Sequence, residues 1–227
     1  MLKSIVKIVG ATALFAGVHS LLASRAVKRG AAKMLGERRR NALYRPLYNV
    51  HAVITFGALA LYGGKLPDRE LYRASEPLSR LMRCGQALSL LYLLYGTRQI
   101  GLLRFAGVPN LWALLAGRTH VPREPEGQGP ALDARGAVKA TGPFRASRHP
   151  LNFGMIPALW LMPRMTVNLA AFNTAVTVYL IAGSLHEEAR LRATYGQAYL
   201  DYQKSGANFF IPSASRLLAP GRGEGHE

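Results

Sequence analysis

Five stretches of the chain are almost free of charged residues, and basic segments separate most of them. They are residues 9–22, 50–64, 84–97, 151–163 and 165–185. A helix that crosses a membrane needs about 20 predominantly apolar residues. With their flanking residues, the stretches predict an all-α integral membrane protein with about five transmembrane helices. The last two stretches lie so close together that they predict a helical hairpin turning at Pro163.

The first stretch also fits the apolar region of a secretory signal peptide. Its small-residue cleavage signal is poor, and it runs straight into a basic segment that begins at Arg25. These features favour a retained membrane anchor.

Positive charge is concentrated next to the apolar stretches. The chain has 29 Lys and Arg against 12 Asp and Glu, a formal net charge of +17. If the five helices alternate in direction, residues 25–47, 98–148 and those after 185 share one side and hold 21 cations, against 8 on the other. Cytoplasmic loops are enriched in Lys and Arg. The count predicts an outside N-terminus and a cytoplasmic C-terminus in a bacterial inner membrane, with the lipid bilayer as partner and no nucleic acid.

The same pattern divides the chain into four parts. Residues 1–104 would hold three membrane helices. Residues 105–140 would form an interfacial segment and a cytoplasmic loop rich in Gly and Pro. Residues 141–213 would form a core of two membrane helices and a C-terminal helix, and residues 214–227 a flexible tail.

The motif at residues 141–154, TGPFRASRHPLNFG, precedes the fourth apolar stretch. Pro150 suits the first turn of a helix, which would place His149 at the N-cap. Exposed N–H groups at a helix start, with Arg148 nearby, suit a carboxylate or phosphate. Gly154 removes a side chain where a ligand or a helix approaches. The alternative is a membrane helix with basic anchors and a simple His149 cap.

A pair of carboxylates, Glu187 and Glu188, ends the fifth stretch. Such groups are costly at a membrane boundary unless they are solvated or paired. Arg190 and Arg192 stand at helical spacings that allow weak ion pairs, which is the structural interpretation. In the functional interpretation, one carboxylate accepts hydrogen bonds from an ammonium group or from ribose hydroxyls.

Three tyrosines follow on one helical face, at positions 195, 199 and 202. Such a stripe is explained by packing against the rest of the protein. The alternative is a site for adenine or for a sulfonium, because aromatic faces attract cations. The apolar segment 208–212 is predicted to fold back on this region.

These motifs in this order resemble the C-terminal core of the isoprenylcysteine carboxyl methyltransferase and phospholipid methyltransferase superfamily. The resemblance rests on Arg148-His149-Pro150-Leu151-Asn152-Phe153-Gly154, Glu187-Glu188, Tyr195-Gly196, Tyr199, Tyr202 and Ile211-Pro212. The N-terminal half is similar, more loosely, to the NnrU and methanethiol S-methyltransferase branch, through His19-Ser20, Tyr44-Arg45 and Tyr48-Asn49.

The resemblance implies an enzyme that holds S-adenosylmethionine in a cytoplasmic pocket and methylates a small or lipidic acceptor from the membrane. The cofactor residues it implies are Arg148, His149, Pro150, Asn152, Gly154, Glu187, Glu188, Tyr199 and Pro212. His149 or Glu187 would be the catalytic base if the acceptor is protonated. Asn152 stands where many members have Tyr, and Ser205 where the isoprenylcysteine enzymes have an arginine, which argues against a prenylcysteine carboxylate as acceptor.

Other functions stay open at this point. An NADPH-dependent sterol-type reductase shares a similar C-terminal core but is about twice as long. A non-catalytic NnrU-type protein of nitrogen-oxide metabolism is the second alternative, and His19 with His51 would then suggest a haem. The single cysteine, Cys84, excludes a disulfide framework and a multi-cysteine zinc site, and no metal is expected.

Overall fold

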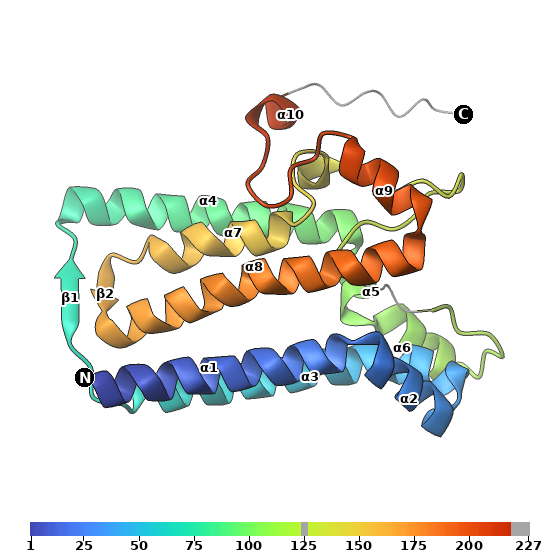
Figure 1. Ribbon diagram of the computed structural model, residues 1–227, viewed down its shortest axis with the longest axis horizontal. Helices are drawn as coiled ribbons and strands as arrows, with labels where there is room; N and C mark the ends of the chain where they lie inside the picture. Colours follow the sequence, from blue (N-terminus) through green and yellow to red (C-terminus); the bar gives the residue numbers. More distant parts are fainter. Residues whose placement is uncertain (124–126, 219–227) are drawn as a thin grey trace.

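The computed structural model describes residues 1–123 and 127–218, and these residues are mostly helical. Four long helices run along the length of the molecule (Figure 1): α1 (Leu2–Ala23), α3 (Glu37–Gly64), α4 (Glu76–Ile100) and α8 (Val167–Tyr195). The shorter α7 (Pro150–Trp160) packs along α4, and α8 packs along α1. In Figure 1, α8 therefore lies between the α1/α3 layer and the α4/α7 layer.

All five predicted apolar stretches fall largely within these helices, but they differ in length and polarity. Among the described residues, only α1 and α8 are long and apolar enough to cross a membrane. The fourth stretch forms α7, which has 11 residues and is about 16 Å long at 1.5 Å per residue, too short to span a bilayer core alone. Within the apolar run of α3, His51 and Thr55 are polar.

The predicted hairpin around Pro163 is present, and its turn contains a strand. The helix α7 ends at Trp160, the strand β2 (Arg164–Thr166) follows, and α8 begins at Val167. β2 pairs antiparallel with β1 (Glu70–Arg73), which lies between α3 and α4. The Thr166 side chain caps α8 by accepting the N–H of Leu169 at 3.2 Å. The β1–β2 pair lies at one end of the molecule and joins the α1/α3 layer to the α4/α7 layer (Figure 1).

The helices of the three most basic segments lie mainly at the opposite end of the molecule (Figure 1). They are α2 (Arg25–Leu35), α5 (Leu102–Ala106), α6 (Val108–Leu115), the 3₁₀ turn Gly142–Arg145, α9 (Gln197–Lys204) and α10 (Ala214–Leu218). Gly107, with φ of 81°, separates α5 from α6. Of the predicted flexible tail, residues 219–227 lie outside the described residues, as do residues 124–126 of the predicted loop.

Burial is uneven along the helices. One buried cluster combines Leu191, Tyr199, Tyr202 and Ala207, close to the C-terminal end of α8. Large apolar side chains in the middle of the long helices are exposed instead, for example Ile54 of α3 at 64% and Leu88 of α4 at 67%. Large exposed apolar patches mark sites of interaction with other proteins or with a membrane.

Candidate functional site

The motif around His149 adopts the predicted helix start. Pro150 is the first residue of α7 and His149 is its N-cap. The loop before it pairs with the chain after α9, because the Arg148 N–H donates to the Asn208 carbonyl at 2.8 Å and the Asn208 N–H donates to the Ala146 carbonyl at 3.1 Å. The prediction that the C-terminal segment folds back on this region is therefore confirmed.

Glu188 connects this loop to the C-terminal helices. One carboxylate oxygen accepts from Arg148 Nε at 2.5 Å and lies 3.4 Å from the Tyr199 hydroxyl. The other accepts from Gln203 at 2.7 Å and from Arg192 at 3.1 Å. The pairing with Arg192 was expected from the helical spacing. Glu188 is buried, and these four partners occupy both of its oxygens.

His149 lies between the two adjacent carboxylates. Its Nδ1 is 3.6 Å from Glu187 and its Nε2 is 3.5 Å from Glu188. Burial by itself would lower the pKa of His149, but the two glutamates close to its ring nitrogens outweigh burial and raise the pKa above its ordinary value. The structure thus favours the imidazolium, which has no lone pair with which to accept a proton.

Glu187 faces a different direction from Glu188. Its Oε1 accepts the backbone N–H of Gln128, from the loop after α6. Gly127 of the same loop packs so closely on the carboxylate that a Cβ there would collide with it. On the remaining side, Glu187 lines a large cavity.

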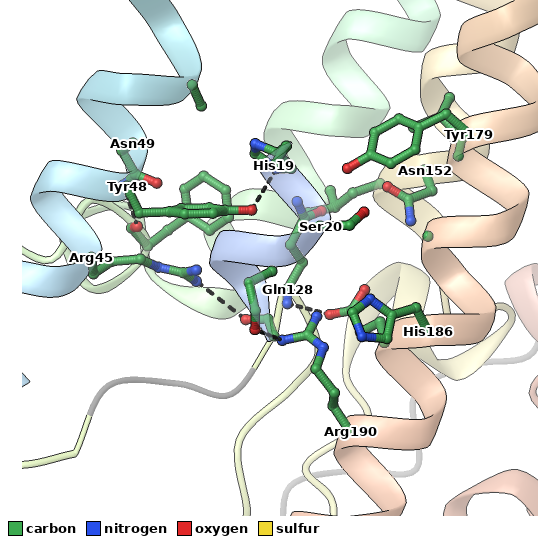
Figure 2. Close-up of a pocket in the computed structure, with 18 of the residues that line it drawn as sticks. His19, Ser20, Arg45, Tyr48, Asn49, Gln128, Asn152, Tyr179, His186 and Arg190 are labelled. Atoms are coloured by element: carbon green, nitrogen blue, oxygen red, sulfur yellow. Dashed lines mark hydrogen bonds between the residues drawn. The ribbon is translucent and has the colours of Figure 1, made fainter. Parts of the chain in front are cut away.

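This cavity has a volume of about 620 Å³ and lies between the two halves of the chain. One wall comes from α1 and α3 and the other from α7 and α8, with parts of α2, α4, α5 and the loop at Gly127 closing it. Figure 2 shows His19 and Tyr48 on one side and Tyr179, Asn152 and His186 on the other.

Two arginines of the cavity wall are held by backbone carbonyls. Arg45 of α3 donates to the Gly127 carbonyl at 3.2 Å, and its guanidinium lies 5.2 Å from the centre of the Phe105 ring. Arg190 of α8 donates to the Ala23 carbonyl at 3.0 Å. These contacts join α3 to the loop and α8 to the end of α1, so residues far apart in the sequence enclose the space (Figure 2).

The hollow directly beside His149 is much smaller. Its volume is about 10 Å³, and Arg148, His149 and Pro150 line it. Such a space holds one water molecule at most. Among the nine cofactor residues expected from the sequence, only Asn152 and Glu187 line the large cavity.

The remaining expected cofactor residues have structural contacts. Gly154 lets α7 approach α4, since a Cβ there would lie 2.9 Å from Leu93. Tyr199 is buried against Tyr202, whose hydroxyl donates to the Phe144 carbonyl at 2.6 Å. The tyrosine stripe is therefore packed on the 3₁₀ turn. Pro212 lies in the segment that returns over the loop, where the Ser213 N–H donates to the Ala146 carbonyl at 3.0 Å.

Local sequence patterns indicate little about the opposite wall of the cavity. This wall includes five residues that the sequence analysis named through the resemblance to one family branch, and His19 also as a haem candidate. They are His19, Tyr44, Arg45, Tyr48 and Asn49. No pattern singled out Gln128, because a Gly- and Pro-rich segment indicates a loop without indicating where the loop lies.

Comparison with known proteins gives distant, partial relatives. A methanethiol S-methyltransferase of Pseudomonas deceptionensis is 37% identical over 93 residues, which are 38% of this chain and 35% of that protein. Another, of Bradyrhizobium diazoefficiens, is 36% identical over 61 residues, 27% of this chain and 24% of that protein. A third, of a Pseudomonas species, is 30% identical over 89 residues, 39% of this chain and 30% of that protein.

The matched part of the chain thus spans about a quarter to a third of the length of these relatives. The resemblance to the isoprenylcysteine carboxyl methyltransferase family, through its methanethiol S-methyltransferase members, is confirmed at this distant level. No protein-family model and no solved structure matches the chain.

Proposed function

We propose that this chain is an integral membrane methyltransferase that uses S-adenosylmethionine and acts on a small or lipidic acceptor that partitions into the membrane. The observation that carries the proposal is the cavity of about 620 Å³ with Glu187 in its wall, in a chain whose partial relatives are methanethiol S-methyltransferases. Its volume falls within the range of about 300–1,000 Å³ that is usual for small-molecule sites.

The residues of the cavity fit the methyl donor by their chemistry. The Glu187 carboxylate would accept hydrogen bonds from ribose hydroxyls or the ammonium group, and Arg190 would attract the carboxylate. The ring of Tyr179 offers a face to a sulfonium. Asn152, whose amide donates to Ser184 at 2.8 Å, adds a carbonyl acceptor at the start of α7.

The other expected residues would support the site from behind. Arg148, His149 and Glu188, with Tyr199 and Pro212, fix the start of α7 and the end of α8, which carry Asn152 and Glu187. Pro150 and Gly154 set how α7 begins and how it packs. In this proposal they hold the cofactor site in shape and Glu187 touches the ligand.

Methyl transfer from a sulfonium is an in-line displacement, so the protein has mainly to position both reactants and exclude water. The bound cofactor would supply the electrophilic methyl group. Glu187 and Glu188 raise the pKa of His149 and so stabilise its protonated form, and in this proposal the imidazolium balances the two carboxylates. Any base for a protonated acceptor would then be Glu187 or a group on the opposite wall.

The membrane arrangement is part of the same proposal. The two apolar helices α1 and α8, together with the outward apolar side chains of α3 and α4, support insertion. The basic end of the molecule, with α2, α6 and α9, would face the cytoplasm, and the β1–β2 end would face outside. Helix α7 would reach partway from the cytoplasmic side, with residues 1–104, 105–140 and 141–213 as the three parts of the folded chain.

The test is calorimetric titration of the detergent-purified full chain with S-adenosylmethionine and with its demethylated product. Glu187→Gln should raise the Kd of both by about tenfold or more, because a charge-assisted hydrogen bond is lost. The matched control is Glu70→Gln, at the exposed β1 strand on the far end, which should bind as the wild type does. Absence of binding in the wild type, or equal binding in both variants, would contradict the proposal.

Methyl transfer itself is then measured with labelled donor and two sources of acceptor, a small alkyl thiol and a membrane lipid extract. Label in the thioether product would identify a thiol acceptor, and label in the extract a lipidic one. Binding of the donor with no transfer to either would favour a non-catalytic protein.

A further inference from the structure

The side of the cavity opposite Glu187 contains a polar pair that the proposed function does not yet use. His19 of α1 and Tyr48 of α3 form a hydrogen bond between Nε2 and the hydroxyl, and both residues line the cavity. The His19 ring packs between Phe15, with ring centres 5.5 Å apart, and Tyr48, at 4.6 Å. Figure 2 shows this pair facing Tyr179 and Asn152 across the space.

The unused nitrogen of His19 indicates which group donates in this pair. Nδ1 is buried, and among the described residues it has no hydrogen-bond partner. A buried N–H without an acceptor is costlier than a bare lone pair. The tautomer with the proton on Nε2 is therefore favoured, and in it Nε2–H donates to the Tyr48 oxygen. The Tyr48 O–H is then free to donate to another group. Because Tyr48 lines the cavity, a ligand in the cavity could be that group.

The charge of the cavity wall favours an anion as the recipient. Of the described lining residues, Lys28, Arg45 and Arg190 are cationic and Glu187 alone is anionic. Arg45 lies three residues before Tyr48, one turn away on the same helix. A negative atom at the Tyr48 hydroxyl would thus lie in a positive field inside a partly water-excluded space, where electrostatic attraction is stronger than in water.

We propose that the Tyr48 hydroxyl, oriented by His19, donates a hydrogen bond to the acceptor atom and binds it as an anion, namely a thiolate. The proposal rests on the proposed function and assigns the acceptor to the α1/α3 side of the cavity and the methyl donor to the α7/α8 side. Tyr48 touches the reacting sulfur, and His19 acts through Tyr48 as a positioning residue.

The chemistry balances without a base from the protein. The thiol loses its proton to solvent water as the thiolate binds. The reaction then forms a C–S bond between the thiolate sulfur and the methyl carbon and breaks the C–S bond of the sulfonium, whose sulfur keeps the electron pair. One positive and one negative charge are neutralised, so donors that hold the thiolate position it and favour its ionisation before the transfer.

The first experiment needs no methyl donor. An aryl thiol whose thiolate absorbs at longer wavelength than the thiol is titrated with the full chain at a pH near the thiol's own pKa. The wild type should increase the thiolate absorbance, because donors that bind the anion lower the pKa of the bound thiol. Tyr48→Phe should reduce this increase, and Tyr62→Phe, at an exposed position on the same helix, should not. An equal thiolate fraction in wild type and Tyr48→Phe overturns the proposal.

The second experiment measures turnover with a small alkyl thiol and labelled donor. Tyr48→Phe should lower kcat/KM by about tenfold or more and move the acid limb of its pH profile to higher pH, with the donor Kd unchanged. His19→Leu should do the same more weakly, and His19→Gln, which retains an N–H donor, should restore part of the activity. An unchanged pH profile in Tyr48→Phe overturns the assignment, whereas loss of donor binding in the wild type would overturn the proposed function and leave the absorbance result to decide on the thiolate site.

Discussion

Glu187 and Glu188 are adjacent on one turn of α8, but the space that is open to a ligand beside each carboxylate differs. On one side, Glu188 forms a closed cluster with Arg148, Arg192, Tyr199 and Gln203 and lines neither the large cavity nor the small hollow. On the other, Glu187 borders a cavity of about 620 Å³. Adjacent helical residues point about 100° apart. Two identical carboxylates therefore have different roles, one in folding and one at the cavity.

The largest expected effect is on the closed cluster. Glu188→Ala removes a buried carboxylate from Arg148, whose side chain is 13% exposed, and removing one partner of a buried ion pair typically costs about 3–5 kcal/mol. Thermal unfolding in detergent should show a much lower Tm, and limited proteolysis should cut the chain after α8. Glu187→Gln should change the Tm far less. Equal Tm values for Glu188→Ala and the wild type would remove the distinction between the two sides.

The next effect concerns the cavity. Gly183 of α8 lines it, and a Cβ there would meet only the Tyr179 ring, at ordinary contact distances of 3.8–4.0 Å. Gly183→Leu should therefore fold normally and fill part of the space, weakening binding of S-adenosylmethionine by about a hundredfold, the equivalent of about 2.7 kcal/mol.

The matched control is Gly57→Leu in α3, where a Cβ would meet nothing within 4 Å and the residue does not line the cavity. It should bind the donor as the wild type does. If calorimetry gives the same Kd for both leucine variants, the ligand does not occupy this cavity.

The smallest expected effect is the contribution of His149 to the pH dependence of stability. His149 lies beside both Glu187 and Glu188. Its pKa is raised in the folded protein by Glu187 and Glu188. The stabilisation is therefore complete below the unfolded pKa, about 6.5, and is lost as the pH rises through the higher folded value. The Tm difference between wild type and His149→Gln should shrink from pH 6 to pH 9. A difference that grows over this interval would show that the folded pKa is not raised.

Local features of the site could be predicted from the sequence. Pro150 fixes a helix start wherever the segment lies, and the spacing of Glu188 and Arg192 predicts their contact on any helix. The apolar stretches predict the long helices because the pattern of apolar positions extends over many residues of each helix. The predicted extent of the fourth stretch was too long for the helix itself, since the chain turns after Trp160 to pair β2 with β1.

The cavity could not be predicted in the same way. His19, Tyr48 and Glu187 are brought together by packing of α1, α3 and α8, and no local pattern encodes contacts over such separations. The loop at Gly127 contacts Glu187 through a backbone N–H, and every residue except proline provides one. Sequence patterns therefore predict the closed cluster around Glu188, because most of its motif is continuous in the chain. They do not predict the cavity beside it.

The most direct test of this account is a structure of the full chain with the demethylated product of S-adenosylmethionine bound. If Glu187 borders the cofactor site, density for the nucleoside should lie in the space between α1, α3 and α8, with a polar atom within hydrogen-bond distance of Glu187 and the contacts of Glu188 intact. Density on the Glu188 side, with its ion pair to Arg148 broken by the ligand, would contradict it.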